Sequence, residues 1–129
     1  MILLAAVDSH MHSLPHSRVM PLLPHLRSIT KKGKLWIRPA SAELFQKESF
    51  PNVHVSDDPL SEAGFSDFVY AEDIPVNDRL DTINKVYLYH FAADAGGALL
   101  DADLSDWQLL SSETMDIGEA AEEEIYVLW

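Results

Sequence analysis

Short apolar runs alternate with amphipathic stretches along most of the chain. The first run, Ile2–Val7, is continuously apolar and ends at Asp8, a pattern typical of a central strand that is buried on both faces. Further short runs, several of them rich in β-branched and aromatic residues, predict strands at 35–37, 53–55, 68–71 and 85–91. The pattern therefore predicts a sheet in which the first strand lies at the centre.

Helical spacing occupies the intervals between these strands. The apolar positions 22, 23, 26 and 29 fall on one helical face, which predicts a helix that ends at Lys32. Ser41 is expected to be the N-cap of a second helix at 42–47, and a short helix is expected at 77–83. Two successive strand–helix units of this kind are typical of a parallel sheet.

The pattern changes in the C-terminal third. Strands are predicted at 107–110 and 125–129, with an acidic loop and no helix between them, so we expect an antiparallel pair. The fold class is therefore α/β, a mostly parallel central sheet with helices on both faces and a C-terminal antiparallel hairpin. A length of 129 residues fits a single domain over 1–129.

The distribution of charge narrows the choice of partners. Nine Lys and Arg stand against 21 Asp and Glu, which gives a net charge of −12 and excludes nucleic acid and anionic membranes as expected partners. The interval 9–42 nevertheless holds six of the basic residues and no carboxylate. We expect the basic face at 18–38 to bind a protein partner or a small anionic ligand, or to be a solvated surface that balances the acidic one.

Residue types that are missing exclude further functions. The chain contains no cysteine, so disulfides, thiolate metal sites and cysteine nucleophiles are ruled out. The apolar opening run is too short to span a membrane, and no basic residue precedes it as in a signal peptide. These features predict a soluble, cytoplasmic protein.

Several segments occur in an order that is informative when they are taken together. They are 1–8, Leu14-Pro15-His16, 22–30, 52–59, 85–90 and 101–113. In this order they resemble the first strand, the end of the substrate loop, the first helix, the third strand, the long strand and the hairpin entry of the dihydrofolate reductase family. The resemblance extends over nearly the whole chain and implies that family's fold.

The resemblance also shows where this chain departs from the family. Its members reduce a pterin by hydride transfer from NADPH, and one buried carboxylate in the first helix binds the pterin and promotes its protonation. The matching position here falls at or near Leu22. A shift in register does not restore the acid, since 9–42 contains no carboxylate.

The segments that match the family's cofactor site are altered as well. The family's Gly-Arg-x-Thr, which places a pyrophosphate at a helix N-terminus, is replaced by Arg38-Pro39-Ala40-Ser41. Arg38 and Ser41 are expected to retain a residual contact to an anion. The family's Gly-Gly is replaced by Ala71-Glu72-Asp73, whose carboxylates repel a polyphosphate. The resemblance therefore implies no bound cofactor.

These departures predict a dihydrofolate-reductase-like protein that has lost hydride transfer and serves as a binding or regulatory module. One alternative is a divergent NADPH-dependent dihydrofolate reductase whose proton donor has moved to a loop histidine or to Asp8. A site emptied of its ligands also leaves apolar groove surface, which favours self-association into a homo-oligomer.

A third function is suggested by His10 and His12. A His-x-His pair directly after a strand is how many hydrolases present two imidazoles to a divalent metal ion. The barrels that supply the remaining ligands need about 250 residues, roughly twice this chain. Exposed loop histidines without a metal are therefore the preferred interpretation.

Overall fold

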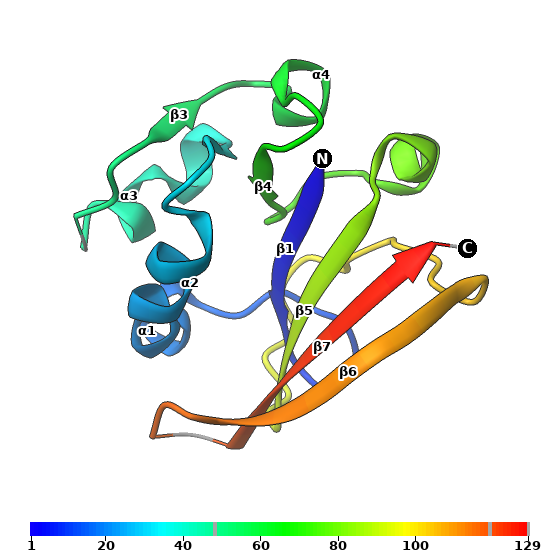
Figure 1. Ribbon diagram of the computed structural model, residues 1–129. Helices are drawn as coiled ribbons and strands as arrows, with labels where there is room; N and C mark the ends of the chain where they lie inside the picture. Colours follow the sequence, from blue (N-terminus) through cyan, green and yellow to red (C-terminus); the bar gives the residue numbers. More distant parts are fainter. Residues whose placement is uncertain (48, 119, 129) are drawn as a thin grey trace.

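The computed structural model describes residues 1–129 except 48, 119 and 129, and its centre is a seven-stranded mixed sheet (Figure 1). In chain order the strands are β1 Ile2–Val7, β2 Leu35–Ile37, β3 Val53–Val55, β4 Phe68–Tyr70, β5 Lys85–Phe91, β6 Trp107–Asp116 and β7 Ala120–Leu128. Their order across the sheet is β3-β2-β4-β1-β5-β7-β6. The first five are parallel to one another, and β7 is antiparallel to both of its neighbours, β5 and β6.

Helical segments cover both faces of this sheet. They are α1 His16–Val19, the 3-10 turn η1 Met20–Leu22, α2 Leu23–Thr30, η2 Pro39–Ser41, α3 Ala42–Phe45, α4 Pro59–Glu62 and η3 Asn77–Thr82. Side chains from α1, α2 and α3 pack on one face, and side chains from α4 and η3 pack on the other. The predicted α/β class, with helices on both faces and a C-terminal hairpin, is confirmed.

Burial on two sides explains the continuous apolar run at the start of the chain. Leu4 and Ala6 of β1 point into the cluster beneath α2, which we call the helix-side core. Leu3, Ala5 and Val7 point into the cluster on the opposite face. A strand with cores on both sides has no solvent-facing positions, so its sequence does not alternate.

The C-terminal hairpin is longer than the sequence pattern predicts. The predicted strands 107–110 and 125–129 are parts of β6 and β7, which pair from Trp107 opposite Leu128 to Asp116 opposite Ala120; Trp129 lies outside the described residues. The acidic segment between them is therefore mostly strand. Carboxylates are tolerated there because β6 is an edge strand with largely exposed residues.

The helices end earlier than predicted, the first helical region begins earlier, at His16, and α4 was not predicted. The first helical region ends at Thr30, α3 ends at Phe45, and 77–82 is a 3-10 helix. In the part of the chain that the structure describes, no helix has the length and apolar character needed to cross a membrane.

Candidate functional site

The topology of the sheet points to the edge at which β1 and β4 end. From β1 the chain passes through α1 and α2 on one face, and it returns in β2 on the far side of β4. From β4 it passes through η3 on the other face and returns in β5. In open α/β sheets, ligands bind beyond the carboxyl ends of the strands where the connections diverge in this way.

The space directly between the ends of β1 and β4 is almost completely filled, whereas a cavity of about 250 Å³, lined in part by Arg38, Asp58 and Ile74, lies beyond the ends of β2 and β3. The cavity between β1 and β4 has a volume of about 10 Å³, and its lining comes from the ends of these two strands and from two loops: Ala6, Val7, Ser13, Ala71, Asp73, Ile74, Ala98, Leu99 and Leu100. Small-molecule sites usually measure roughly 300 to 1,000 Å³, and a single water needs about 10 to 15 Å³. As it stands, the space between the ends of β1 and β4 has room for about one water molecule.

Two loops close this edge by pairing with each other. The amide of Ser13 donates to the carbonyl of Ala98 at 2.8 Å, and the amide of Leu100 donates to the carbonyl of Met11 at 2.8 Å. Gly97 makes this approach possible, because a Cβ at this position would lie 2.3 Å from the Ser13 carbonyl oxygen. We call this contact the loop closure.

Replacing Gly97 tests the loop closure. In Gly97→Ala the new methyl group meets backbone, so the two loops must separate and lose hydrogen bonds, and we expect a loss of about 2 kcal/mol in the free energy of unfolding. Gly64→Ala is the control, because its nearest contact would be an ordinary 3.4 Å from Asp67. Urea denaturation gives both values, and equal midpoints for the two variants would contradict the account.

Asp8 anchors the same loops from inside. Its carboxylate is completely buried and accepts backbone hydrogen bonds from His10, His12, Ala95 and Gly96 at 2.8, 3.0, 2.7 and 3.3 Å. Burial by itself would raise the pKa of Asp8, but the four hydrogen bonds outweigh it and hold that pKa far below its usual range. An acid this strong is ionised at neutral pH, which argues against Asp8 as a relocated proton donor.

Glu72 organises a second polar cluster at the end of β4. The buried Ser41 hydroxyl donates to Glu72 Oε1 at 2.6 Å, and His16 Nε2 lies 2.8 Å from Glu72 Oε2. Arg38 Nη1 donates to the carbonyl of Asp73 at 2.7 Å. The structure therefore brings together the two residues predicted to contact an anion, and their partners are groups of this chain.

Ser41 is the N-cap residue of α3, as expected, but it does not cap the helix through its side chain. Its side chain makes no capping hydrogen bond to α3, because the hydroxyl is directed to Glu72. In the turn after β4, Asp73 has a φ of 57°. This left-handed backbone conformation is the one that glycine adopts most easily, and Asp tolerates it better than most other residues.

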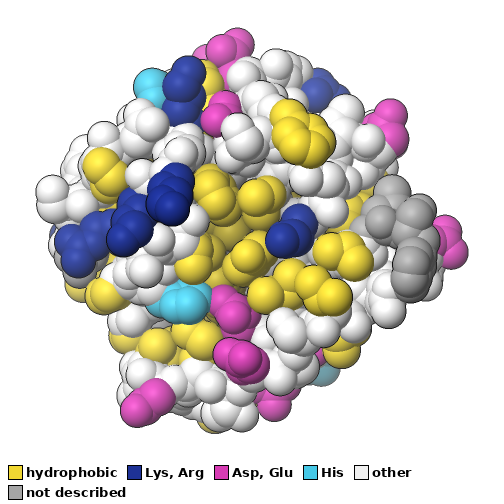
Figure 2. All heavy atoms as spheres, viewed as in Figure 1, with side chains coloured by type: hydrophobic (Ala, Val, Ile, Leu, Met, Phe, Trp, Pro, Cys, Tyr) yellow, Lys and Arg dark blue, Asp and Glu magenta, His cyan; other side chains and the backbone are white. Residues whose placement is uncertain are grey.

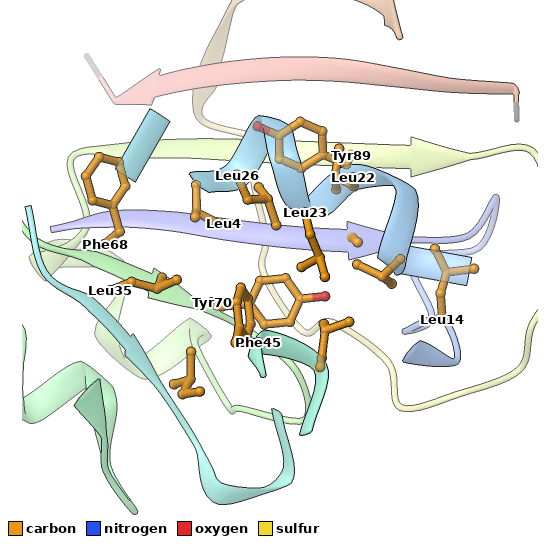
Figure 3. Close-up of a cluster of buried hydrophobic side chains, with 14 of the residues drawn as sticks. Leu4, Leu14, Leu22, Leu23, Leu26, Leu35, Phe45, Phe68, Tyr70 and Tyr89 are labelled. Carbon is orange, nitrogen blue, oxygen red and sulfur yellow. The ribbon is translucent and has the colours of Figure 1, made fainter. Parts of the chain in front are cut away.

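The helix position at which the family has its acid is part of the helix-side core. Leu22 has no exposed surface, and Figure 3 shows it beside Leu23 and Leu26, facing the sheet. Tyr70 and Phe45 lie in the same cluster with their rings 5.0 Å apart. Burial, followed by the charge of Glu72, raises the pKa of Tyr70. Large side chains thus fill the space between α2, α3 and the sheet.

The structure does not bring the two loop histidines together with further metal ligands. His12 Nδ1 lies 2.9 Å from the carbonyl oxygen of Gly97, and His10 is exposed. Among the described residues, no group of three or more His, Cys, Asp or Glu side chains could hold a metal ion.

Sequence reasoning missed a buried carboxylate on the hairpin. Glu123 Oε2 accepts a hydrogen bond from the hydroxyl of Tyr89 at 2.9 Å and lies 2.6 Å from His25 Nε2. Burial, together with the charge of Glu123, raises the pKa of Tyr89. These contacts tie α2 to β7. No sequence spacing could reveal them, because His25 and Glu123 are 98 positions apart.

Comparisons with known proteins agree with this architecture. No known family model matches the sequence, and no curated protein matches it. Dihydrofolate reductase from Enterococcus faecalis, solved with NADP(H) and RAB-propyl, is similar in structure with a TM-score of 0.69 and 14% identity, over 98% of this chain and 95% of that one. A protein from Shewanella sp. PV-4 described as a riboflavin biosynthesis protein has a TM-score of 0.58 and 12% identity, over 98% and 97% of the two chains. This chain therefore has the dihydrofolate reductase fold.

Proposed function

We propose that this protein keeps the dihydrofolate reductase fold but no longer transfers hydride, and that it serves as a binding or regulatory module. The observation that supports the proposal is that the chain's own residues fill the space between the ends of β1 and β4. A cavity of about 10 Å³ remains where β1 and β4 end, and the Glu72 carboxylate takes hydrogen bonds that a phosphate would otherwise accept there. A dinucleotide at this edge would have to displace the chain's own groups.

The helix-side core supports the same proposal. Pterin protonation requires an acid near the ring, whereas Leu22 is apolar and completely buried. Glu123 is a buried acid, but its carboxylate already binds Tyr89 and His25. Position 22 therefore has no carboxyl group, and the carboxyl group of Glu123 is already bound by other side chains.

The basic face supplies a surface for binding. A groove of about 430 Å³ lies over α2, and it is lined by Pro24, Arg27, Ser28, Lys31, Ser49 and Pro51. Figure 2 shows Lys and Arg side chains gathered in a row in this region, beside an apolar hollow. Two cations and two hydroxyls in one groove suit an anionic group, so we propose this groove as the place where a ligand or partner binds.

The loss of hydride transfer is tested by mixing the purified protein with NADPH and dihydrofolate and following absorbance at the nicotinamide band. We expect no decay above that of a sample without protein. A decay that depends on both substrates and scales with protein concentration would establish the alternative, a divergent NADPH-dependent reductase.

The binding role is tested by capture of partners from the native lysate. We expect Arg27→Ala/Lys31→Ala to lose the partner that the unaltered protein retains. The control is Lys32→Ala/Lys34→Ala, which removes the same charge at exposed positions outside the groove lining. Equal capture by both double variants would contradict binding at this groove.

A further inference from the structure

A separate cavity of about 340 Å³ lies at the C-terminal hairpin, beside Glu122 of β7. Its lining comes from the loop after β1 and from three adjacent strands: Ser9, His90, Phe91, Ala92, Thr114, Ala120, Ala121 and Glu122. None of these residues takes part in the strand edge or in the groove over α2. Its volume falls within the usual range of small-molecule sites, and it is an open hollow, since five of its eight lining residues are exposed.

The strand register places three polar side chains in one row across this cavity. Glu122 of β7 is paired with His90 of β5 on one side and with Thr114 of β6 on the other. Because directly opposite residues point to the same face of a sheet, the carboxylate stands between the imidazole and the hydroxyl. Glu123, the next residue, points to the opposite face, where it meets Tyr89.

Glu122 is the lining residue that carries a formal charge, and the lining contains no Lys or Arg. Every lining residue comes from 1–17 or 86–129, and these two stretches contain no Lys or Arg. The second stretch alone holds ten Asp and Glu. A pocket built only from such segments repels anions and attracts cations.

The cavity also has an apolar part and an unsatisfied polar atom. Ala120 lies two positions before Glu122 in β7 and shares its face, and Ala92 lies next to it, with its amide donating to the Ala120 carbonyl at 2.9 Å; both line the cavity. His90 Nε2 is buried and has no hydrogen bond within the described part of the chain, and Glu124 Oε1 lies 3.6 Å away. The imidazole edge is therefore directed toward Glu124, and the His90 ring lines the cavity beside Glu122.

We propose that this cavity binds a small organic cation, an ammonium group on a short alkyl body. The ammonium group pairs with the Glu122 carboxylate and the alkyl part lies against Ala92 and Ala120. The row of hydroxyl and imidazole groups supplies the remaining hydrogen-bond partners. This site is independent of the proposed binding role of the basic face.

Calorimetric titration with n-butylammonium chloride at low ionic strength tests the proposal, with n-butanol as the neutral probe of similar shape. We expect binding of the cation and no measurable binding of the alcohol. Glu122→Gln should weaken the affinity about 10-fold or more, because a charge-assisted hydrogen bond is lost. Glu113→Gln is the matched control, since Glu113 is exposed and lies opposite Glu123, on the other face of the hairpin.

A variant that fills the cavity tests whether the cation binds there or is attracted only by the negative charge of the whole protein. Ala120→Phe keeps the net charge but fills the space beside Glu122, and it alters an exposed position, so we expect it to fold and to abolish binding. Circular dichroism verifies the fold. The proposal is overturned if the unaltered protein gives no binding heat with butylammonium, if Glu113→Gln weakens binding as much as Glu122→Gln, or if folded Ala120→Phe binds normally.

Discussion

Asp8→Asn is expected to lower the free energy of unfolding by about 4 kcal/mol, because a buried carboxylate that accepts four backbone hydrogen bonds is replaced by an amide. The side-chain shape is kept, but one oxygen becomes an NH₂ group that faces two backbone N–H donors. Those donors, the amides of Ala95 and Gly96, lose their acceptor and face another donor in a partly buried position, and each such loss costs about 1 to 3 kcal/mol. Thermal denaturation should show a melting temperature lower by roughly 10 °C.

The same substitution predicts a pH dependence with a definite sign. The pKa of Asp8 is far below its usual range in the folded protein, whereas an unfolded Asp titrates near ~3.9. Its contribution to stability is therefore fully present above the unfolded pKa, and it is lost as the pH falls below that value. The difference between the unaltered protein and Asp8→Asn should be widest above about pH 5 and should narrow steadily toward pH 2.

Asp94→Asn is the matched control, because Asp94 lies in the neighbouring loop and is exposed. We expect it to change the free energy of unfolding by less than about 0.5 kcal/mol. A stability of Asp8→Asn equal to that of Asp94→Asn would refute the anchoring role of Asp8. A gap that stayed constant down to pH 2 would refute its low pKa.

Leu22→Asp, which puts an acid at the family's position, is expected to cost about 5 kcal/mol or more. Leu22 is completely buried in the helix-side core, so the substitution removes buried apolar volume and also places a carboxyl group in apolar surroundings. This loss approaches the whole stability of a typical domain. We expect no NADPH-dependent reduction from any fraction that still folds, because the space beside position 22 is filled.

Leu22→Ala separates the cost of the lost apolar volume from the cost of burying a carboxyl group. It creates a cavity without adding a charge and should cost about 3 kcal/mol. Urea denaturation at pH 7 and pH 5 compares the two variants, and the extra penalty of Leu22→Asp should shrink at the lower pH, where the buried carboxyl group is protonated. If Leu22→Asp were as stable as Leu22→Ala at pH 7, the position would have access to water or to a partner, and our account of the core would be wrong.

The parallel part of the fold could be predicted closely because its strands have strong local signals. The predicted strands Ile2–Val7, Leu35–Ile37, Val53–Val55 and Lys85–Phe91 are confirmed. The hairpin was predicted less well. Its acidic residues look like a loop in the sequence, since nothing local indicates that β7 pairs on both sides.

The site could be predicted only in part for the same physical reason. Leu22, Arg38 and Ser41 were identified through the resemblance to dihydrofolate reductases, and the structure places Arg38 and Ser41 beside the turn of Glu72 and Asp73. The loop closure joins residues about 85 positions apart through backbone atoms. Backbone contacts over such separations carry no side-chain pattern, so only the folded chain reveals them.

The most direct test of the central claim, that the chain's own groups fill the sheet edge between β1 and β4, is thermal unfolding with and without NADPH. A ligand that binds only the folded state adds about 2.7 kcal/mol of stability at 100 times its dissociation constant, which would raise the melting temperature by several degrees. We predict the same melting temperature with and without millimolar NADPH. A rise that grows with NADPH concentration would contradict the account.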